Sequence, residues 1–404
     1  MKITAIKTAV VEANFDWTFV RVYTDQGLYG TGECFFAPGL TGAIRDIAEV
    51  ILHEDPRNID YLTKLMRRAT SSSGAAGGVV VHAITGIEFA LWDLLGKNLK
   101  APVWQLLGGK WRDQVRIYAD SHGGHALESM GPCTLPRTPH WSQVQPGTAE
   151  TEPDSFNPAG YASMAQQVVA KGFTALKFDI DIFVSHHKCE TRSLTSDEIQ
   201  FQISLVKAVR EAVGPTIDIA IDCHWRYNLN DVLQIAWGCE PYGLMWLEDP
   251  MPPENLENLA LVTRQTKTPI CTGENAYLVH GFRPLIQTNA CRIIAPDLQK
   301  AGGVLEAKRI ADMADMFSIP VAPHCIASPI GMMQSAHICA TMPNFLVLEF
   351  HAMSVPFFDA LKQGDHRPLI QNGHITVTDK PGFGIELDEE VARRYAKPGE
   401  VFFA

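Results

Sequence analysis

Three short apolar runs that each end in an acidic residue are the most informative part of the chain. They read IDIAID at 217–222, MWLE at 245–248 and ICTGE at 270–274. Their acids, Asp222, Glu248 and Glu274, follow one another at equal intervals of 26 residues. Such an interval fits one strand, one helix and their connections in a chain of repeated βα units. We therefore predict three successive parallel strands, each of which ends in a carboxylate.

The same alternation continues on both sides of these runs. Five further short apolar runs are separated by amphipathic stretches, and they lie at 115–119, 175–180, 292–295, 320–322 and 345–350. Eight such strands predict an α/β protein with a modified (β/α) barrel of the TIM type. An open doubly wound sheet would also alternate in this way. However, no Gly-x-Gly-x-x-Gly motif follows the first strand, and acids end successive strands, so the barrel is favoured.

The residues before the barrel show a different pattern of apolar residues. Strand-like runs at 5–12, 19–24 and 28–34 precede helical spacing of apolar residues over 44–68 and 81–96. The last stretch is apolar on nearly every side, which is typical of a buried helix. We predict an α+β capping domain over 1–112, a barrel over 113–366, and a C-terminal return to the cap over 367–404.

One long segment interrupts the barrel after its first strand. Residues 121–157 are rich in Pro, Gly, Ser, Thr and His, which excludes a regular helix or a central strand. Because the segment follows a barrel strand, we expect it over the barrel mouth as a lid or binding loop. A surface insertion without a role in binding is the alternative.

Composition excludes several classes of partner. The chain has 404 residues, of which 46% are hydrophobic, and its net charge is −11. An acidic protein lacks the positive field that attracts nucleic acids or anionic membranes. The N-terminus shows neither a signal peptide nor a membrane span, so we predict a cytoplasmic protein. The nine cysteines form no Cys-x-x-Cys pair and are expected to be reduced and packed in the core.

The three acids at the strand ends predict a metal site. The carboxyl ends of barrel strands meet at one face, so the carboxylates of Asp222, Glu248 and Glu274 would converge there. Three anionic groups repel one another unless a cation neutralises them. A hard divalent ion with oxygen ligands would be Mg²⁺, with Mn²⁺ as a second candidate. Alternatively, each acid could cap a helix or form an ion pair.

Two further strand ends predict a general base. Asp297 and His324 follow neighbouring strands, so the carboxylate could hold one imidazole nitrogen, fix its tautomer and raise its basicity. A core histidine and a helix-capping aspartate are the alternatives. His224 lies two residues beyond Asp222 and on the same side of the strand. It could bind the metal or donate a proton as a general acid, and the metal role is weaker because Mg²⁺ prefers oxygen.

Several charged residues near these positions could contact a substrate. Arg226 could pair with a carboxylate or hydroxyls, or be a surface residue. Lys177 and Asp179 share one face of a strand. Lys177 could orient a substrate carboxylate or another base, and Asp179 could bind hydroxyls or a basic group. Glu349 could bind an enediolate or a hydroxyl, or cap a helix.

Side chains of the cap are expected to determine which substrate binds. Trp17, Phe35 and Phe36 lie on loops next to the early strands and are candidate contacts, although packing in the core is an equal alternative. A polar substrate also needs hydrogen-bonding groups, which the 122–125 region, with His122 and His125, could supply. No Gly-x-Ser-x-Gly, Walker or His-Glu-x-x-His motif is present, which argues against serine hydrolases, nucleoside triphosphatases and zinc proteases.

Taken together, these motifs resemble the mandelate racemase subgroup of the enolase superfamily. The resemblance rests on LK at 176–177, DCH at 222–224, WLEDP at 246–250, GEN at 273–275, PDLQKAGG at 296–303 and PH at 323–324, with ITGIEFALWDLLGK at 84–97 resembling the cap helix. It spans nearly the whole chain. It implies a cap built from both termini, Mg²⁺ on the three acids, an Asp297 and His324 base, and a position for Lys300 near the site.

The chain departs from the racemases of this family at one position. Those enzymes carry a second lysine two residues after the equivalent of Lys177, whereas this chain has Asp179. Racemisation with two bases needs a proton acceptor on each face of the carbon, and an aspartate is a poor one. The Asp-x-His pattern at 222 and 224 is instead similar to the galactonate, gluconate and mannonate dehydratases.

The resemblance therefore implies a Mg²⁺-dependent sugar acid dehydratase. It would remove the α-proton of an aldonate or aldarate and eliminate the β-hydroxyl to give a 2-keto-3-deoxy sugar acid, and we expect a homo-oligomer. A racemase, epimerase or cycloisomerase would use the same enediolate chemistry. A carbohydrate-sensing protein on a former enzyme scaffold is the non-enzymatic alternative.

Overall fold

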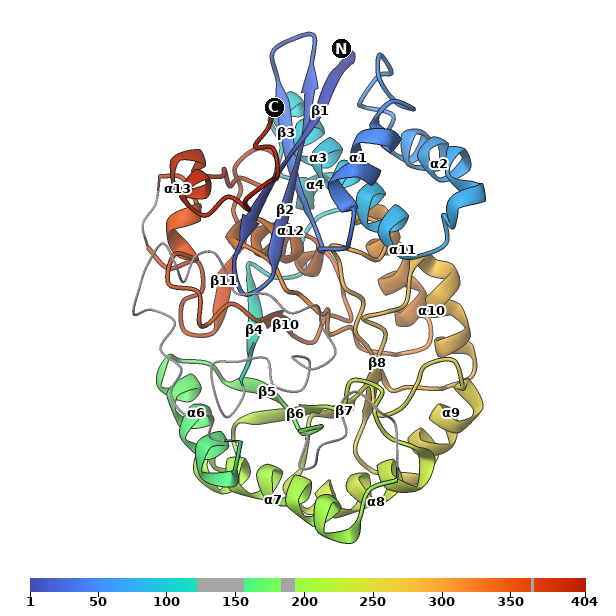
Figure 1. Cartoon of the computed structure of the whole chain (residues 1–404), viewed down its shortest axis with the longest axis vertical. Coiled ribbons are helices and arrows are strands. Elements are labelled where there is room, and N and C mark those ends of the chain that lie inside the picture. The colour runs from blue at the N-terminus through green and yellow to red at the C-terminus, as the bar shows by residue number, and fades with distance from the viewer. Residues whose placement is uncertain (122–155, 183–192, 365–366) are drawn as a thin grey trace.

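The protein, seen here as a computed structural model, consists of a strand-rich cap above a barrel (Figure 1). The structure describes residues 1–121, 156–182, 193–364 and 367–404. The predicted lid at 121–157, with His122 and His125, lies almost entirely outside the described residues.

Parallel strands form the barrel. They are β4 (Gln114–Asp120), β5 (Ala175–Asp179), β6 (Asp218–Asp222), β7 (Trp246–Glu248), β8 (Ile270–Thr272), β9 (Ile293–Ile294) and β10 (Leu348–Phe350). They pair in the order β10-β4-β5-β6-β7-β8-β9. Single parallel bridges from Ile294 to Val321 and from Val321 to Phe345 complete the circle. Each of the eight predicted runs therefore contributes to the ring, and the predicted fold class is confirmed.

A layer of side chains fills the barrel interior and fixes which residues face its mouth. All eight segments contribute to this layer, whose members are Tyr118, Ala175, Ala220, Trp246, Cys271, Ile293, Ala295, Ala322 and Val347. Successive side chains of a strand point to opposite faces, so a residue two positions further on points inward again, one layer higher. At this higher level the side chains are polar, as described below.

Helices surround the barrel on its outer side. They are α6 (Pro158–Ala170), α7 (Ser196–Val213), α8 (Leu229–Cys239), α9 (Leu256–Gln265), α10 (Leu278–Gln287), α11 (Val304–Asp315) and α12 (Pro329–Ala340). Capping residues in the sequence explain where two of these helices begin. Thr195 and Glu198 form a reciprocal capping box at α7, and the Asn228 side chain accepts two backbone N–H groups at α8.

The cap begins with the antiparallel meander β1 (Ile3–Glu12), β2 (Asp16–Thr24) and β3 (Tyr29–Cys34). The helices α1 (Leu40–Ala48), α2 (Ile59–Ala69) and α3 (Val79–Leu99) follow. The helical spacing predicted over 44–68 is thus divided between two helices. Pro56 lies in the connection, where a residue without a backbone N–H cannot continue a helix.

Helix α3 is the core of the cap. Its length and composition would allow it to cross a membrane, but 89% of its most apolar window is buried inside the protein. A helix that is apolar on all sides belongs in a core, as the sequence predicted. Strand β3 packs so closely on it that a Cβ atom at Gly32 would lie 2.3 Å from the carbonyl oxygen of Gly86. Only glycine fits at that crossing.

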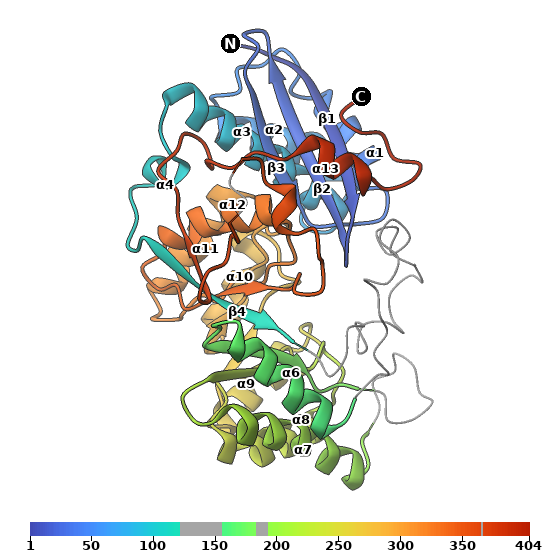
Figure 2. The same ribbon diagram turned by 90° about the vertical axis from the view of Figure 1, so that its left-hand side faces the viewer.

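The remaining elements are short, and several of them lie where the chain passes between cap and barrel. They are α4 (Val103–Leu106), β11 (His374–Thr376), α13 (Glu389–Arg394) and the short 3-10 turns Ser71–Ser73, Glu240–Tyr242 and Asp359–Leu361. Strand β11 pairs antiparallel with β4 of the barrel. The chain then reaches the cap, where Ala396 forms a bridge with Val11, and Figure 2 shows α13 against the cap strands.

Two buried carboxylates from the cap attach it to the barrel helices. Glu33 of β3 accepts the backbone N–H groups of Ser328 and Gly331, each at 2.9 Å, at the start of α12. Glu88 of α3 accepts the first two backbone N–H groups of α11, at 2.7 and 3.2 Å. A helix N-terminus presents unpaired donors and a partial positive charge, which suit an anion. Burial nevertheless raises the pKa of both carboxyls to about 7.

We expect Glu33→Ala to lower the free energy of unfolding by roughly 3 kcal/mol, because buried donors at the start of α12 lose their acceptor. Urea titration of the metal-free protein measures the change. Glu390→Ala is the control, since its carboxylate pairs with Arg394 on an exposed helix face and should change stability by less than about 0.5 kcal/mol. Equal stabilities of the two variants would show that Glu33 does not anchor the cap.

Candidate active site

The three predicted metal ligands converge at the barrel mouth. Asp222 and Glu248 are register partners at the ends of β6 and β7, and Glu274 lies two residues beyond β8. All three are buried, and one carboxylate oxygen from each lies within 4.8 Å of the others. Buried carboxylates this close need a compensating cation, and an all-oxygen set suits a hard divalent ion. The residues present therefore fit Mg²⁺ or Mn²⁺.

Lys177 of β5 lies beside these acids. Its ammonium nitrogen is 3.0 Å from Asp222 Oδ2, 3.2 Å from Glu248 Oε1 and 2.9 Å from Glu349 Oε1. Burial alone would lower the pKa of Lys177, but the charges of Glu248 and Glu349 raise it well above its ordinary value. The lysine is therefore a fixed positive charge among buried anions. Glu349 is held in turn by the backbone N–H of Cys325, at 2.9 Å.

We expect Lys177→Met to destabilise the metal-free protein by about 3 to 5 kcal/mol, because buried carboxylates lose their cation. A divalent ion would replace part of that charge. The rise in unfolding temperature on adding Mg²⁺ should therefore be larger in the variant than in the unmodified protein, as measured with and without a chelator. An equal rise would mean that Lys177 does not share its electrostatic role with the metal.

The predicted pair of Asp297 and His324 forms on the other side of the acids. His324 Nδ1 lies 2.6 Å from Asp297 Oδ2, and both side chains are buried. This contact directs the ring so that Nε2 lies 3.5 Å from Glu274 Oε2 and 3.6 Å from Glu349 Oε2. Burial lowers the pKa of His324, but the charge of Glu274 and the other carboxylates raises it to about 10. A divalent ion held by Glu274 would offset this carboxylate charge and lower the pKa again, so that Nε2, which faces the site, could take up a proton.

His224 occupies a strained turn directly after β6. Its φ of 42° and the 60° of Trp225 are both left-handed, a conformation that non-glycine residues adopt at a cost and often at functional sites. The backbone N–H of His224 donates to Asp222 Oδ1 at 3.0 Å. Burial lowers the pKa of the ring, but the carboxylates of Asp222 and Asp179 raise it well above the ordinary value. The geometry thus favours a protonated imidazole.

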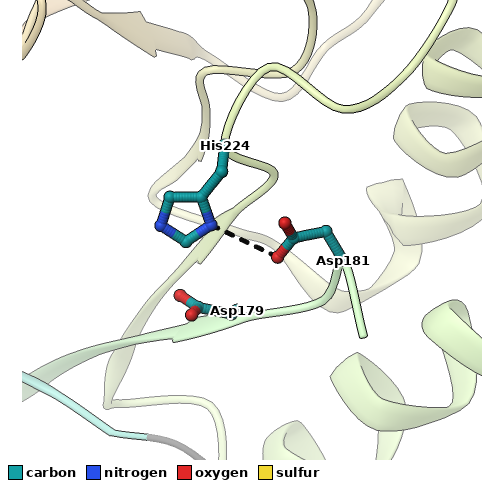
Figure 3. Close-up of side chains that lie close together, drawn as sticks. All are labelled: Asp179, Asp181 and His224. Atoms are coloured by element: carbon teal, nitrogen blue, oxygen red, sulfur yellow. Dashed lines mark hydrogen bonds and ion pairs between the residues drawn. The ribbon is translucent and has the colours of Figure 1, made fainter. Parts of the chain in front are cut away.

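Asp181 is a residue that the sequence analysis missed. Its Oδ1 lies 3.3 Å from His224 Nδ1 (Figure 3), and its Oδ2 lies 2.8 Å from Arg226 Nε. Arg226 therefore pairs with Asp181, which in turn contacts the imidazole. Asp181 follows Asp179 by two residues, so strand periodicity alone could have placed it on the same face.

Asp179, Asp181 and His224 also have donor atoms within 4.8 Å of one another, which is the spacing of a metal site. In this group, the positive charges come from side chains and not from a metal ion. The imidazole and the Arg226 guanidinium both contact Asp181, so this group differs from the three acids, which consist of carboxylates alone.

A cavity of about 150 Å³ lies between the barrel mouth and the cap. Among the described residues that line it are the predicted contacts Phe35 and Phe36, and also Lys300, for which the resemblance implied a position near the site. The Lys300 ammonium is 3.0 Å from Asn275 Oδ1 and lies over the Phe35 ring, 4.2 Å from its centre. Trp17 is not part of this lining. It is 1% exposed and packs edge-on against Phe357 and Phe358 in the cap core, so it contacts no space that a substrate could fill.

Family models match both parts of the chain. Residues 3–108 match the mandelate racemase / muconate lactonizing enzyme N-terminal domain, and residues 160–391 match the enolase C-terminal domain-like family. The chain belongs to the mandelate racemase/muconate lactonizing enzyme family. The resemblance inferred from its motifs is thereby confirmed, and the barrel and cap are those of the enolase superfamily.

Individual members of the mandelate racemase/muconate lactonizing enzyme family are similar over their full length. A D-xylonate dehydratase of Haloferax volcanii is 41% identical over 404 residues, covering 100% of this chain and 90% of that protein. A D-galactonate dehydratase of Cronobacter sakazakii is 28% identical over 401 residues, covering 96% and 93%. Both relatives are named dehydratases, which are hydro-lyases, and their similarity supports that enzyme class for this family member.

A solved structure in the same family has the same fold. A mandelate racemase/muconate lactonizing enzyme-like protein from Rubrobacter xylanophilus superposes with a TM-score of 0.90 at 39% identity, covering 100% of this chain and 99% of that one.

Proposed function

We propose that this protein is a Mg²⁺-dependent sugar acid dehydratase. It removes the α-proton of an aldonate or aldarate, eliminates the β-hydroxyl as water and yields a 2-keto-3-deoxy sugar acid. The dehydratases among its relatives support the reaction class. One arrangement in the site carries the proposal: two histidines follow barrel segments on opposite sides of the ring, with a cluster of three carboxylates that could hold a metal ion beside them.

The topology of the barrel sets the two imidazoles opposite each other. His224 follows β6, and His324 follows the Val321 segment, which is four positions further round the ring of eight. The strand ends that carry Glu248 and Glu274 lie between them. A substrate held at the acids would thus have one imidazole on each side, as an elimination that needs both a base and an acid requires.

Asp222, Glu248 and Glu274 would hold the Mg²⁺ ion, with Mn²⁺ as the alternative. When bound, the ion acts as a Lewis acid toward the carboxylate of the substrate and lowers the cost of removing its α-proton. Lys177 and Glu349 lie beside the acids, where they would contact the carboxylate and the α-hydroxyl. Asp179 lines the same cavity and would accept a hydrogen bond from a hydroxyl.

His324 takes the α-proton on Nε2, and Asp297 stabilises the imidazolium that results. A histidine or lysine base beside Mg²⁺ is the general pattern of enolase-superfamily sites, so this role for His324 follows the family. His224 then gives its proton to the β-hydroxyl, the carbon–oxygen bond breaks and water leaves. The enol product takes up a proton and becomes the 2-keto acid. Asp181 and Arg226 hold the His224 ring, which makes Arg226 a positioning residue.

The experiment is to incubate the protein and Mg²⁺ with a panel of aldonates and aldarates and to assay 2-keto acids. Mass spectrometry should show a product lighter by one water. A product of unchanged mass would instead identify a racemase, epimerase or cycloisomerase. No conversion of any acid, with or without Mg²⁺, would contradict the proposed function and favour a sensing role.

We further propose that the protein acts in the cytoplasm as a homo-oligomer, without a nucleic-acid or membrane partner. The net charge of −11 supports the absence of a nucleic-acid or membrane partner, because the protein would repel polyanions and anionic lipids. Light scattering on the purified protein measures its mass in solution and checks the assembly.

A further inference from the structure

Lys300 is a buried lysine of the cavity to which the mechanism above gives no part. It is 3% exposed and lines the cavity together with Glu274 and His324. Its ammonium donates to Asn275 Oδ1 at 3.0 Å and lies 4.2 Å from the centre of the Phe35 ring. Neither of these two partners carries a negative charge. The lysine is therefore removed from water without the anion that usually accompanies a buried ammonium.

Lys177, which lines the same cavity, has very different surroundings. Its ammonium has carboxylate oxygens of three acidic residues within 3.2 Å. Among the residues that the structure describes, no carboxylate forms an ion pair with Lys300, and Asn275 is the one acceptor of its ammonium. An ammonium has three N–H donors. Two donors of Lys300 thus remain available to a molecule that binds in the cavity.

Hydrogen bonds between the cap and the barrel fix the position of Lys300. Its own backbone N–H donates to the carbonyl of Asp297 at 3.2 Å. The carbonyl of the preceding residue, Gln299, accepts the backbone N–H of Phe35 at 3.1 Å. The Phe35 carbonyl in turn accepts from His82 Nδ1 at 3.1 Å, since a carbonyl oxygen can only accept. Because these bonds hold both the lysine and the ring beside it, its free donors are in place before a substrate binds.

The other groups of the site leave one part of the substrate for Lys300. Under the proposed function, the metal ion and Lys177 hold the carboxylate, His324 takes the α-proton and His224 protonates the β-hydroxyl. These contacts account for the first three carbons of a sugar acid. Lys300 forms no ion pair with any of the three acids that would hold the metal, whereas it contacts Phe35 of the cap. Its donors are therefore available to hydroxyl groups beyond the third carbon, on the cap side of the site.

We infer that Lys300 donates hydrogen bonds to hydroxyl oxygens of the substrate beyond the β-carbon, and that it thereby determines substrate specificity. A hydroxyl oxygen has lone pairs that can accept from an ammonium. Such bonds favour sugar acids of five or six carbons over hydroxy acids that end at the third carbon. This inference rests on the proposed function and narrows its substrate class.

The test compares an aldonate, the better substrate of xylonate and galactonate, with glycerate in the unmodified protein and in Lys300→Met. Glycerate has the carboxylate, the α-proton and the β-hydroxyl that the reaction needs, and nothing beyond the third carbon. Methionine keeps most of the length of lysine but cannot donate. We expect kcat/KM for the aldonate to fall about 10- to 100-fold, because hydrogen bonds from a charged group are lost. The value for glycerate should change less than about 2-fold, since it makes none of the lost contacts.

Further measurements separate recognition from folding. Lys267→Met is the matched control, because Lys267 pairs with Glu240 at the protein surface and should leave kcat/KM for both acids unchanged. Asn275→Ala removes the acceptor that orients the ammonium and should lower kcat/KM for the aldonate by a smaller factor. The rise in unfolding temperature on adding Mg²⁺ should persist in Lys300→Met, which shows that this variant is folded. Where glycerate is converted too slowly to follow, its inhibition constant against the aldonate replaces kcat/KM.

Two results would overturn the inference. An equal fall for both acids in Lys300→Met would place the lysine at the reacting carbons, and no fall for either acid would exclude it from binding. In both cases the unmodified protein still converts the aldonate, so the proposed function is upheld.

Binding distinguishes these results from failure of the proposed function. If neither acid is converted, calorimetric titration of each acid into the Mg²⁺-loaded protein still compares their affinities. Weaker binding of the aldonate alone in Lys300→Met would uphold the role of Lys300 although the protein is not a dehydratase. Absence of binding by either acid would contradict both.

Discussion

Replacing His324 with asparagine is expected to abolish exchange of the substrate's α-proton with deuterated water and to lower kcat by about 1000-fold or more. The reason is geometric. Nε2 faces the carboxylates of the site, while Nδ1 is held 2.6 Å from Asp297, so this ring is fixed and directed at the acids. Asparagine keeps the polarity of the side chain but cannot take up a proton. Exchange measured by NMR reports the proton transfer even when elimination is slow.

Two controls make this result specific to the base. His280→Asn alters an exposed histidine on α10 and should leave exchange unchanged. In His324→Asn itself, stabilisation by Mg²⁺ should persist, since the three acids remain. Undiminished exchange in His324→Asn would exclude this residue as the base. Loss of exchange together with loss of Mg²⁺ stabilisation would point to a disturbed metal site instead.

Glu248→Gln is expected to weaken Mg²⁺ binding at least about 100-fold and to remove nearly all turnover. This side chain is fully buried, contacts the Lys177 ammonium and accepts the Trp246 indole N–H at 2.7 Å. Glutamine keeps its volume and its acceptor oxygen but removes the charge that a hard divalent ion requires. Calorimetry with Mg²⁺ in the absence of substrate measures the affinity without relying on activity.

Glu211→Gln provides the matched control, because Glu211 lies on the exposed face of α7 beside Lys207. It should bind Mg²⁺ as the unmodified protein does. If Glu248→Gln also binds with unchanged affinity, the three strand-end acids are not the ligands. The mechanism would then lose its Lewis acid at this position.

Much of the site could be predicted because barrel geometry converts sequence spacing into position. Equal intervals of 26 residues place successive acids on adjacent strands, and the period of two then directs them inward. The contact between Asp297 and His324 follows from the same two rules. Strand ends are therefore predictable even where the strand itself, as at Val321, consists of a single bridge.

Other features depend on contacts between distant segments. Nothing near Trp17 indicates that it packs against Phe357 and Phe358, because those partners lie more than 300 residues further along the chain. The bond from Asn14 to His351 is equally remote. For Asp181, the period of two after Asp179 could have indicated the face of the strand, but its ion pair with Arg226 forms only through the fold, because 45 residues separate the two in the sequence.

The anchoring of the cap through Glu33 and Glu88 limits how members of this architecture can be recombined. Each carboxylate is matched to the first turn of one particular barrel helix, α12 for Glu33 and α11 for Glu88. A chimera that took the cap of one protein and the barrel of another would bury these anions opposite turns not shaped to receive them. Exchanging substrate preference by domain grafting therefore requires moving each acid with its receiving helix as a unit, whereas point changes at the cavity wall leave both junctions intact.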